Sequence, residues 1–259
     1  MIYLKTDDEI ELLRKANLLV SATLTEIAKI IRPGITTLQM DSLAEQFIRD
    51  NGAVPTFKGF PNPYGSAFPA SICTSVNDVV VHGIPNDTPL KDGDIVSVDC
   101  GTLLDGFCGD SCYTFCVGEV KPEVKALLET TKAALYNAIE TAIPGKRLGD
   151  IGYAVQSLCE SKGYGVVREF VGHGIGREMH EDPQVPNYGK RGTGKQLKNG
   201  LCIAIEPMIT MGTHEIMMKE DRWSVATRDG RFAAHFEHTI AIHHGKADIG
   251  TQPFHRHHR

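Results

Sequence analysis

The sequence predicts an α+β fold in which helices cover a mostly antiparallel sheet built from two related halves. Apolar residues at helical spacing mark four segments, and strand-like runs occupy much of the rest of the chain. The helix pairs also recur at a fixed offset, because Pro144-Gly145 follows Pro33-Gly34 by 111 residues. A chain of 259 residues is long enough for one large domain, which we expect to span residues 1–249.

The first half opens with two expected helices. The first spans residues 7–31, where Thr6 is placed to cap the helix and Pro33-Gly34 ends it. The second spans about residues 40–49 and is followed by Gly52. The first helix carries apolar residues three and four positions apart, namely Ile10, Leu13, Ala16, Val20, Leu24, Ile27 and Ile31.

The second half repeats this layout. A helix begins near Pro122 and ends at Pro144-Gly145, and another spans about residues 151–161 before Gly163. The offset of 111 residues is far too long for a solenoid. It predicts two similar halves, about residues 6–117 and 121–245. Coincidence between two helix–Pro-Gly–helix units is the alternative.

Strand-like runs, separated by turn signals such as KDGD and RDGR, follow each helix pair. Short turns favour antiparallel pairing between neighbouring strands. The expected strands are residues 71–76, 79–82, 95–100, 110–117, 166–171, 201–210, 224–227 and 232–242.

Composition narrows the class of protein. Hydrophobic content of 41% and charged content of 23% are ordinary for a globular protein, and the net charge of −5 does not favour a nucleic-acid partner. No apolar run approaches the ~20 residues of a membrane helix. The N-terminus lacks the basic-then-apolar layout of a signal peptide. We therefore expect a cytoplasmic protein with no membrane partner.

The seven cysteines form an odd set, which argues against a secreted disulfide framework. Four of them, Cys100, Cys108, Cys112 and Cys116, lie close in sequence without a Cys-x-x-Cys pair. A zinc ribbon is one interpretation, and small buried hydrophobic residues are the better one. Residues 250–259 are expected to form a tail outside the fold, either disordered or added in cloning.

Five residues carry the functional signal: Asp99, Asp110, His173, Glu206 and Glu237. Each lies in a strand-like run or a glycine-rich turn, where an unpaired acid would be costly. Four carboxylates and one imidazole are a ligand set for divalent cations. Like charges at ~4 Å repel by about 4 kcal/mol at an effective dielectric near 20. Two divalent cations would balance four carboxylates, so a two-metal centre is favoured.

Several motifs resemble those of the type I methionine aminopeptidases, which belong to the pita-bread metallopeptidase family (M24). The similarity covers about residues 3–247. The motifs are residues 77–85 (NDVVVHGIP), 91–99 (KDGDIVSVD), 106–110 (GFCGD), 172–177 (GHGIGR), 206–208 (EPM) and 236–239 (FEHT). The resemblance implies the pita-bread fold, in which two pseudo-symmetric halves form a curved, mostly antiparallel sheet covered by helices.

The resemblance also implies roles for the matching residues. Asp99, Asp110 and Glu237 would hold one divalent metal ion, and Asp110, His173, Glu206 and Glu237 the other. Cobalt, manganese, iron(II) and zinc all suit this ligand set. Glu206 would also act as the general base.

Two further histidines would contact the substrate. His180 would hydrogen-bond the scissile carbonyl, and His82 the amide nitrogen beyond it. A pocket for the first side chain would be lined by Phe68, Cys73, His82, Met179, Met208 and Trp223. The loop of residues 60–67 departs from the family by its length and its lack of a histidine, and Met179 stands where bacterial relatives often carry an aromatic residue.

The implied activity is metal-dependent removal of the N-terminal methionine from peptides and nascent proteins with a small second residue. The expected partners are peptides and nascent chains, the latter at the ribosome, and the family is usually monomeric. Two alternatives stay open. One is an Xaa-Pro aminopeptidase or prolidase, although Asp99 comes too early for the large N-terminal domain of those relatives. The other is a non-catalytic binding protein on the same scaffold.

Overall fold

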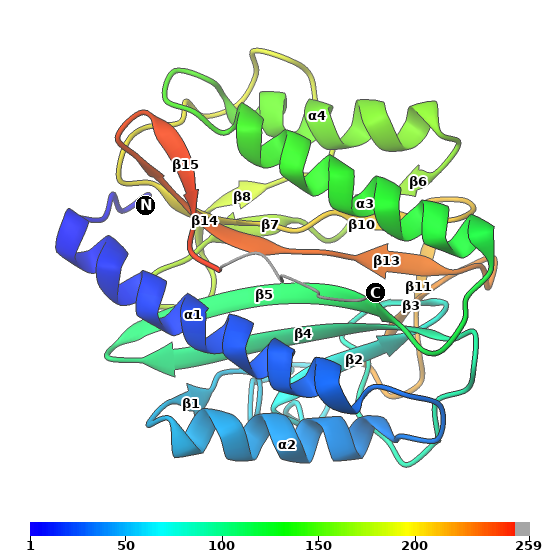
Figure 1. Cartoon of the computed structure of the whole chain (residues 1–259). Coiled ribbons are helices and arrows are strands. Elements are labelled where there is room, and N and C mark those ends of the chain that lie inside the picture. Colours follow the sequence, from blue (N-terminus) through cyan, green and yellow to red (C-terminus); the bar gives the residue numbers. More distant parts are fainter. Residues whose placement is uncertain (252–259) are drawn as a thin grey trace.

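Four helices occupy the predicted positions in the computed structural model, which describes residues 1–251 (Figure 1). They are α1 (Asp7–Ile30), α2 (Thr37–Asp50), α3 (Pro122–Thr141) and α4 (Leu148–Ser161). The prediction of four helices is confirmed, although α2 and α4 each begin three residues earlier than expected. The reason lies in their first turns, where Gln39 accepts from the Thr36 N–H at 2.9 Å and Asp150 accepts from the Arg147 N–H at 2.8 Å.

The first half contains a sheet centred on one long hairpin. Strand β4 (Ile95–Leu104) pairs with β5 (Phe107–Cys116) over ten residue pairs, and its other edge pairs with β2 (Ile72–Val76) and β1 (Val54–Pro55). Strand β3 (Val79–Val81) instead joins β12 (Val225–Thr227) and β11 (Ile216–Met218) from the second half.

The second half contributes two more sheets. Five strands follow the order β15-β14-β9-β7-β8, and three follow the order β13-β10-β6. Every pairing between the described strands is antiparallel, as predicted. The bounds are β6 (Gly165–Val166), β7 (Gly172–Gly174), β8 (Glu181–Val185), β9 (Cys202–Ile205), β10 (Met208–Thr210), β13 (Ala233–His235), β14 (His238–His243) and β15 (Lys246–Ile249).

Two of the predicted strands are each divided in two. The run 201–210 forms β9 and β10, and the run 232–242 forms β13 and β14. Strands β9 and β14 pair in one sheet while β10 and β13 pair in another. The two paired segments therefore pass from one sheet to the other side by side. Pro207 lacks the N–H that a continuous ladder would need, which accounts for the break in the first run. The run 166–171 is strand only at its first residue.

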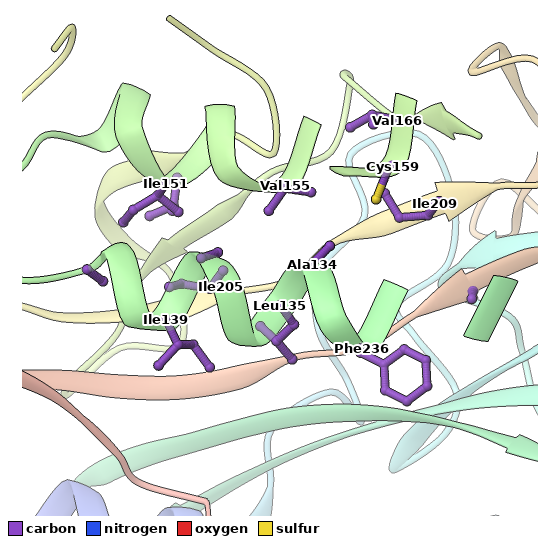
Figure 2. Close-up of a cluster of buried hydrophobic side chains, with 14 of the residues drawn as sticks. Ala134, Leu135, Ile139, Ile151, Val155, Cys159, Val166, Ile205, Ile209 and Phe236 are labelled. Carbon is purple, nitrogen blue, oxygen red and sulfur yellow. The ribbon is translucent and has the colours of Figure 1, made fainter. Parts of the chain in front are cut away.

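Each half has its own apolar core. One core lies between α1, α2 and the strands β2, β4 and β5. The other lies between α3, α4 and the strands of the second half, where Leu135, Ile139, Ile151 and Val155 face Ile205, Ile209 and Phe236 (Figure 2). The four cysteines that could have formed a zinc ribbon all lie on β4 and β5, and Cys100, Cys108 and Cys112 are buried there.

The C-terminal boundary of the packed chain lies two residues beyond the expected domain end. Gly250 N–H donates to the Thr239 carbonyl at 2.9 Å, and Thr251 is buried with its hydroxyl 2.5 Å from His238 Nδ1. Residues 252–259 of the expected tail lie outside the described residues. Within residues 1–251, no helix combines the length and the apolar character needed to cross a bilayer.

Helix α1 packs directly on the backbone of β5 at Gly109. A Cβ at Gly109 would lie 2.6 Å from the carbonyl carbon of Ala16 and 2.7 Å from the nitrogen of Asn17. Next to it, Asn17 Oδ1 accepts from the Asp110 N–H at 3.0 Å. The glycine therefore sets the distance between α1 and the strand that carries Asp110.

We expect Gly109→Ala to lower the free energy of unfolding by about 1–3 kcal/mol, because overpacking against backbone atoms forces α1 away from β5. Urea denaturation of the metal-free protein measures this loss. Gly65→Ala is the matched control, since a Cβ there meets only side-chain atoms at 3.4 Å or more. Equal stability of the two variants would show that α1 does not rest on Gly109.

Candidate metal and substrate site

The two predicted aspartates lie on the β4–β5 hairpin. Residue Gly101 is paired with Asp110, and Asp99 stands two positions from Gly101 on the same face of β4. The two carboxylates are therefore diagonal neighbours across the hairpin, which is close enough for direct interaction. The predicted hairpin thus brings Asp99 and Asp110 to one point.

The two glutamates lie where the chain changes sheet. Glu206 stands between β9 and β10, and Glu237 stands between β13 and β14. Their neighbours Ile205 and Phe236 point into the core under α3, as Figure 2 shows. Because adjacent side chains in extended backbone point to opposite sides, the two glutamates face away from that core.

Backbone hydrogen bonds tie this junction to the first half. Ser111 donates its hydroxyl to the Glu237 carbonyl at 2.6 Å, and the Glu237 N–H donates to the Cys112 carbonyl at 2.9 Å. Thr239 donates to the Asp110 carbonyl at 2.9 Å. These bonds place Glu237 beside the aspartates, although more than a hundred residues separate them in sequence.

His173 comes from β7. The residues before and after it are glycines, and the neighbouring backbone leaves no room for a side chain at either position. A Cβ at Gly172 would lie 2.3 Å from the Ala204 carbonyl oxygen, and one at Gly174 would lie 2.1 Å from that of Asp182. His173 Nδ1 lies 2.9 Å from the Gly174 carbonyl, so this nitrogen carries the proton as a donor. His173 Nε2 lies 3.5 Å from both Asp110 Oδ2 and Glu206 Oε1, so it is the ring nitrogen that faces the carboxylates.

The group has the features of a cation site. Ligand atoms of Asp110, His173 and Glu237 all lie within 4.8 Å of one another. Among the described residues, no hydrogen-bond partner reaches the buried atoms Asp99 Oδ1, Asp110 Oδ1 or Glu237 Oε1. Buried carboxylate oxygens without donors are costly, and metal coordination removes that cost.

Protonation states support the same conclusion. Burial, followed by the neighbouring carboxylates, raises the pKa of Asp99 and of Glu237 well above the usual range. Burial alone would lower the pKa of His173, but the hydrogen bond to Asp110 and the charge of Glu206 raise it to about 9. Without cations, this cluster therefore relieves its charge by holding protons.

All five of these side chains line one cavity of about 160 Å³. Its other walls are mainly aromatic. Phe68 meets Trp223 edge to face with ring centroids 5.1 Å apart, and the Trp223 indole N–H donates to the Ser66 carbonyl at 2.9 Å. The remaining lining residues are Phe57, Phe60, Cys73, His82 and His180.

Two histidines border both this cavity and its opening. The His180 ring lies 4.5 Å from that of His173 and 5.6 Å from Phe60, and His82 meets Phe170 edge to face at 5.3 Å. Desolvation, helped by a neighbouring histidine, lowers the pKa of His82 and of His180 to about 4. Both rings are therefore neutral near pH 7 and able to donate one hydrogen bond each.

Two predicted pocket residues are not among the lining residues of this cavity. Met179 packs with Leu13, Phe107 and Ile175 in an apolar cluster that is also contacted by Phe57 from the cavity wall. Met208 lines the adjoining cavity together with Phe170 and His235. The assignment of both methionines to the substrate pocket stays a prediction.

Sequence reasoning missed three residues at the site. Phe57 and Phe60 complete the aromatic wall, and His235 Nε2 lies 3.5 Å from Glu206 Oε2. The position of His235 two residues before Glu237 was a usable signal, because residues i and i+2 of a strand share a face. No comparable signal marked Phe57 or Phe60, which precede the first well-formed strand.

The sequence matches a known protein family. The model of metallopeptidase family M24 matches residues 11–244. The chain is 49% identical to a methionine aminopeptidase of Clostridium acetobutylicum, covering 93% of this chain and 95% of that protein. It is 46% identical to methionine aminopeptidase 1 of Bacillus subtilis, covering 97% and 100%.

Solved structures give the same picture. A methionine aminopeptidase from Rickettsia prowazekii superposes with a TM-score of 0.93 at 43% identity, covering 97% of this chain and all of that one. A prolidase from Pyrococcus furiosus superposes with a TM-score of 0.77 at 23% identity and covers 96% of this chain and 65% of that one. At that identity the prolidase is informative about the fold alone.

We expect binding of Mn²⁺ to the metal-free protein to release protons, because Asp99, Glu237 and His173 hold protons that a cation must displace. Affinity should therefore fall as the pH is lowered from about 9 to about 6. Calorimetry in buffers of different ionisation enthalpy measures both quantities. Affinity that does not change with pH would contradict the protonated cluster.

Proposed function

The chain belongs to metallopeptidase family M24, and we propose that it removes the N-terminal methionine from peptides and nascent proteins whose second residue is small. One observation carries this proposal: five side chains that can bind metal line the same aromatic-walled cavity. A cavity of this kind accepts one side chain and leaves the rest of a peptide outside. The metal-binding groups therefore lie next to the first peptide bond.

The ligand set suits two divalent cations, because four carboxylates carry the charge that two such ions balance. We propose that Asp99, Asp110 and Glu237 hold one ion and that Asp110, His173, Glu206 and Glu237 hold the other. Cobalt, manganese, iron(II) and zinc are all compatible with oxygen and imidazole ligands. When bound, a pair of such ions makes hydroxide available near neutral pH and polarises the scissile carbonyl.

The cavity walls suit a methionine side chain. Phe68, Cys73 and Trp223 present aromatic and sulfur surface, against which a thioether packs favourably. Trp223 is held in place by its bond to Ser66, and Asn62 of the same loop donates to the Arg222 carbonyl at 3.0 Å. The loop of residues 60–67 therefore forms the rim of the cavity and contributes to its selectivity.

Three side chains are placed for proton transfer and charge stabilisation. Glu206 takes a proton from the attacking water, and its position within 3.5 Å of His173 keeps it beside the metal-binding groups. His180, neutral at pH 7, donates to the oxyanion that develops on the carbonyl. His82, which lines the same cavity, contacts the amide nitrogen of that bond.

Peptide selectivity separates this proposal from its alternatives. Hydrolysis of Met-Ala-Ser but not of Ala-Pro-x peptides supports a methionine aminopeptidase, and the reverse pattern supports a prolidase-like enzyme. A purified chain that binds no divalent metal would instead favour the non-catalytic scaffold. We further expect the protein to act as a monomer in the cytoplasm on nascent chains, in line with seven free thiols.

We expect Glu206→Gln to lower kcat on Met-Ala-Ser by about 10²–10⁴-fold, because an amide cannot accept the proton of the attacking water. Thermal denaturation should show that the variant stays folded, since its shape and volume hardly change. Wild-type kcat in this variant would exclude Glu206 as the general base.

His180→Ala should lower kcat more than it raises KM, because a bond to the oxyanion strengthens only as the transition state forms. Steady-state kinetics over a range of peptide concentrations separates the two constants. An effect confined to KM would assign His180 to ground-state binding.

A further inference from the structure

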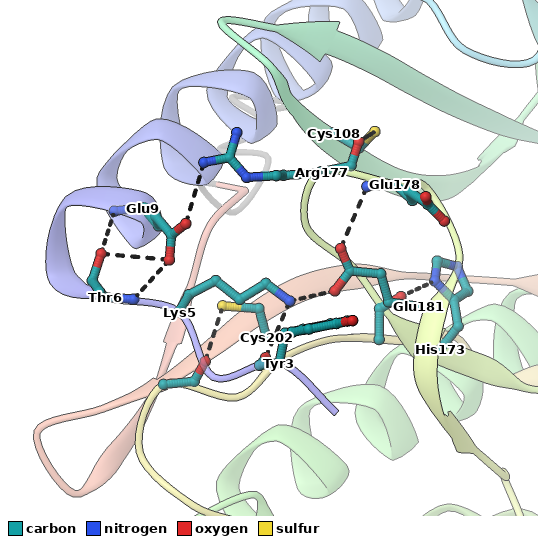
Figure 3. A network of polar contacts seen from close by, with 12 residues as sticks. Tyr3, Lys5, Thr6, Glu9, Cys108, His173, Arg177, Glu178, Glu181 and Cys202 are labelled. Carbon is teal, nitrogen blue, oxygen red and sulfur yellow. Dashed lines mark hydrogen bonds and ion pairs between the residues drawn. The ribbon is translucent and has the colours of Figure 1, made fainter. Parts of the chain in front are cut away.

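The segment before α1 contacts the β7–β8 turn, residues 175–180, which carries His180 (Figure 3). Lys5 Nζ pairs with the carboxylate of Glu181, the residue that follows His180 and begins β8. Glu9, in the first turn of α1, pairs with Arg177 at 3.3 Å. The Met1 ammonium also pairs with Asp182 of β8, so three ion pairs join residues 1–9 to residues 177–182.

The Lys5–Glu181 pair is buried, unlike the Glu9–Arg177 pair. The Lys5 and Glu181 side chains are 6% and 11% exposed, whereas that of Arg177 is 66% exposed. Lys5 Nζ also lies 3.3 Å from the Tyr3 carbonyl, and Glu181 Oε1 accepts from the Glu178 N–H at 3.4 Å. Both partners therefore have further polar contacts, as a buried pair requires.

Two glycines make room for Lys5. A Cβ at Gly176 would lie 2.5 Å from Lys5 Cε and 2.6 Å from Glu181 Oε1. A Cβ at Gly200 would lie 2.8 Å from the Lys5 carbonyl oxygen, and the Lys5 N–H donates to the Gly200 carbonyl at 2.7 Å. Lys5 therefore packs against the backbone at both Gly176 and Gly200, which closely defines its position.

The Lys5–Glu181 ion pair lies next to the part of the turn that faces the cavity. Glu181 is paired with Gly174, the neighbour of His173, and the register of the two strands shifts at this point. Ile175 and Met179 anchor the inner side of the turn in the apolar cluster with Leu13. The Lys5–Glu181 pair therefore fixes the C-terminal end of the turn, directly after His180.

We propose that Lys5 is a positioning residue, whose buried ion pair with Glu181 holds the β7–β8 turn so that the His180 ring faces the cavity beside His173. This inference rests on the proposed function, because it assigns Lys5 a role only through His180. A buried ion pair contributes little net stability compared with apolar packing, but it restricts geometry, which suits such a role.

A double-mutant cycle tests the proposal. Lys5→Met should lower kcat on Met-Ala-Ser by about tenfold with little change in KM, since small displacements of a catalytic group are costly. In a His180→Ala background the same substitution should change kcat by less than about twofold, because coupled residues are not additive. An equal loss in both backgrounds, or no loss in either, would overturn the proposal.

A measurement that does not depend on turnover completes the test. In the metal-free protein, Lys5→Met should speed amide hydrogen exchange in residues 176–181 while leaving α3 unchanged. Unaltered exchange in the turn would contradict the proposed role. Lys29→Met, which breaks an exposed pair with Glu26 on α1, is the matched control and should leave both kcat and exchange unchanged. Wild-type protein inactive on Met-Ala-Ser would refute the proposed function, whereas the exchange result tests Lys5 independently.

Discussion

The structure depends on one electrostatic constraint, the convergence of four carboxylates at a buried point. Asp110 and Glu237 are 4% and 2% exposed, and one oxygen each of Asp99, Asp110 and Glu237 has no donor among residues 1–251. Such a cluster is stable only with bound cations or with bound protons. The raised pKa values of Asp99, Glu237 and His173 mean that the metal-free cluster holds protons. The arrangement of the ligand atoms suits the cation-bound cluster.

The scaffold resists this repulsion through the way its halves are joined. The backbone around Glu237 is bonded to Ser111 and Cys112 of β5, and Thr239 is bonded to Asp110. Apolar cores under both helix pairs support these strands from behind. The carboxylates therefore cannot separate without breaking buried hydrogen bonds, and the site stays assembled when it has to exchange protons for metal ions.

Different residues around the carboxylate cluster serve substrate selection and catalysis in the proposed reaction. Aromatic rings held by the 60–67 loop enclose the space for one side chain, and two neutral histidines stand at its border. The β7–β8 turn connects these parts, since it carries His180 on its outer side and an apolar anchor, Met179, on its inner side. A residue such as Lys5, which does not line the cavity, can therefore affect its geometry through Glu181.

Much of this molecule was readable from local sequence. Helical spacing and capping residues located all four helices, and the repeated Pro-Gly signals indicated two related halves. Four acids in strand-like runs and one histidine in a glycine-rich turn marked the residues of the cluster. Local patterns could not reveal that β9–β10 and β13–β14 change sheet together, or that Phe57 and Phe60 reach the site. Periodicity and propensity act over a few neighbouring residues, whereas these features arise from contacts between segments distant in sequence, which exist only once the chain has folded.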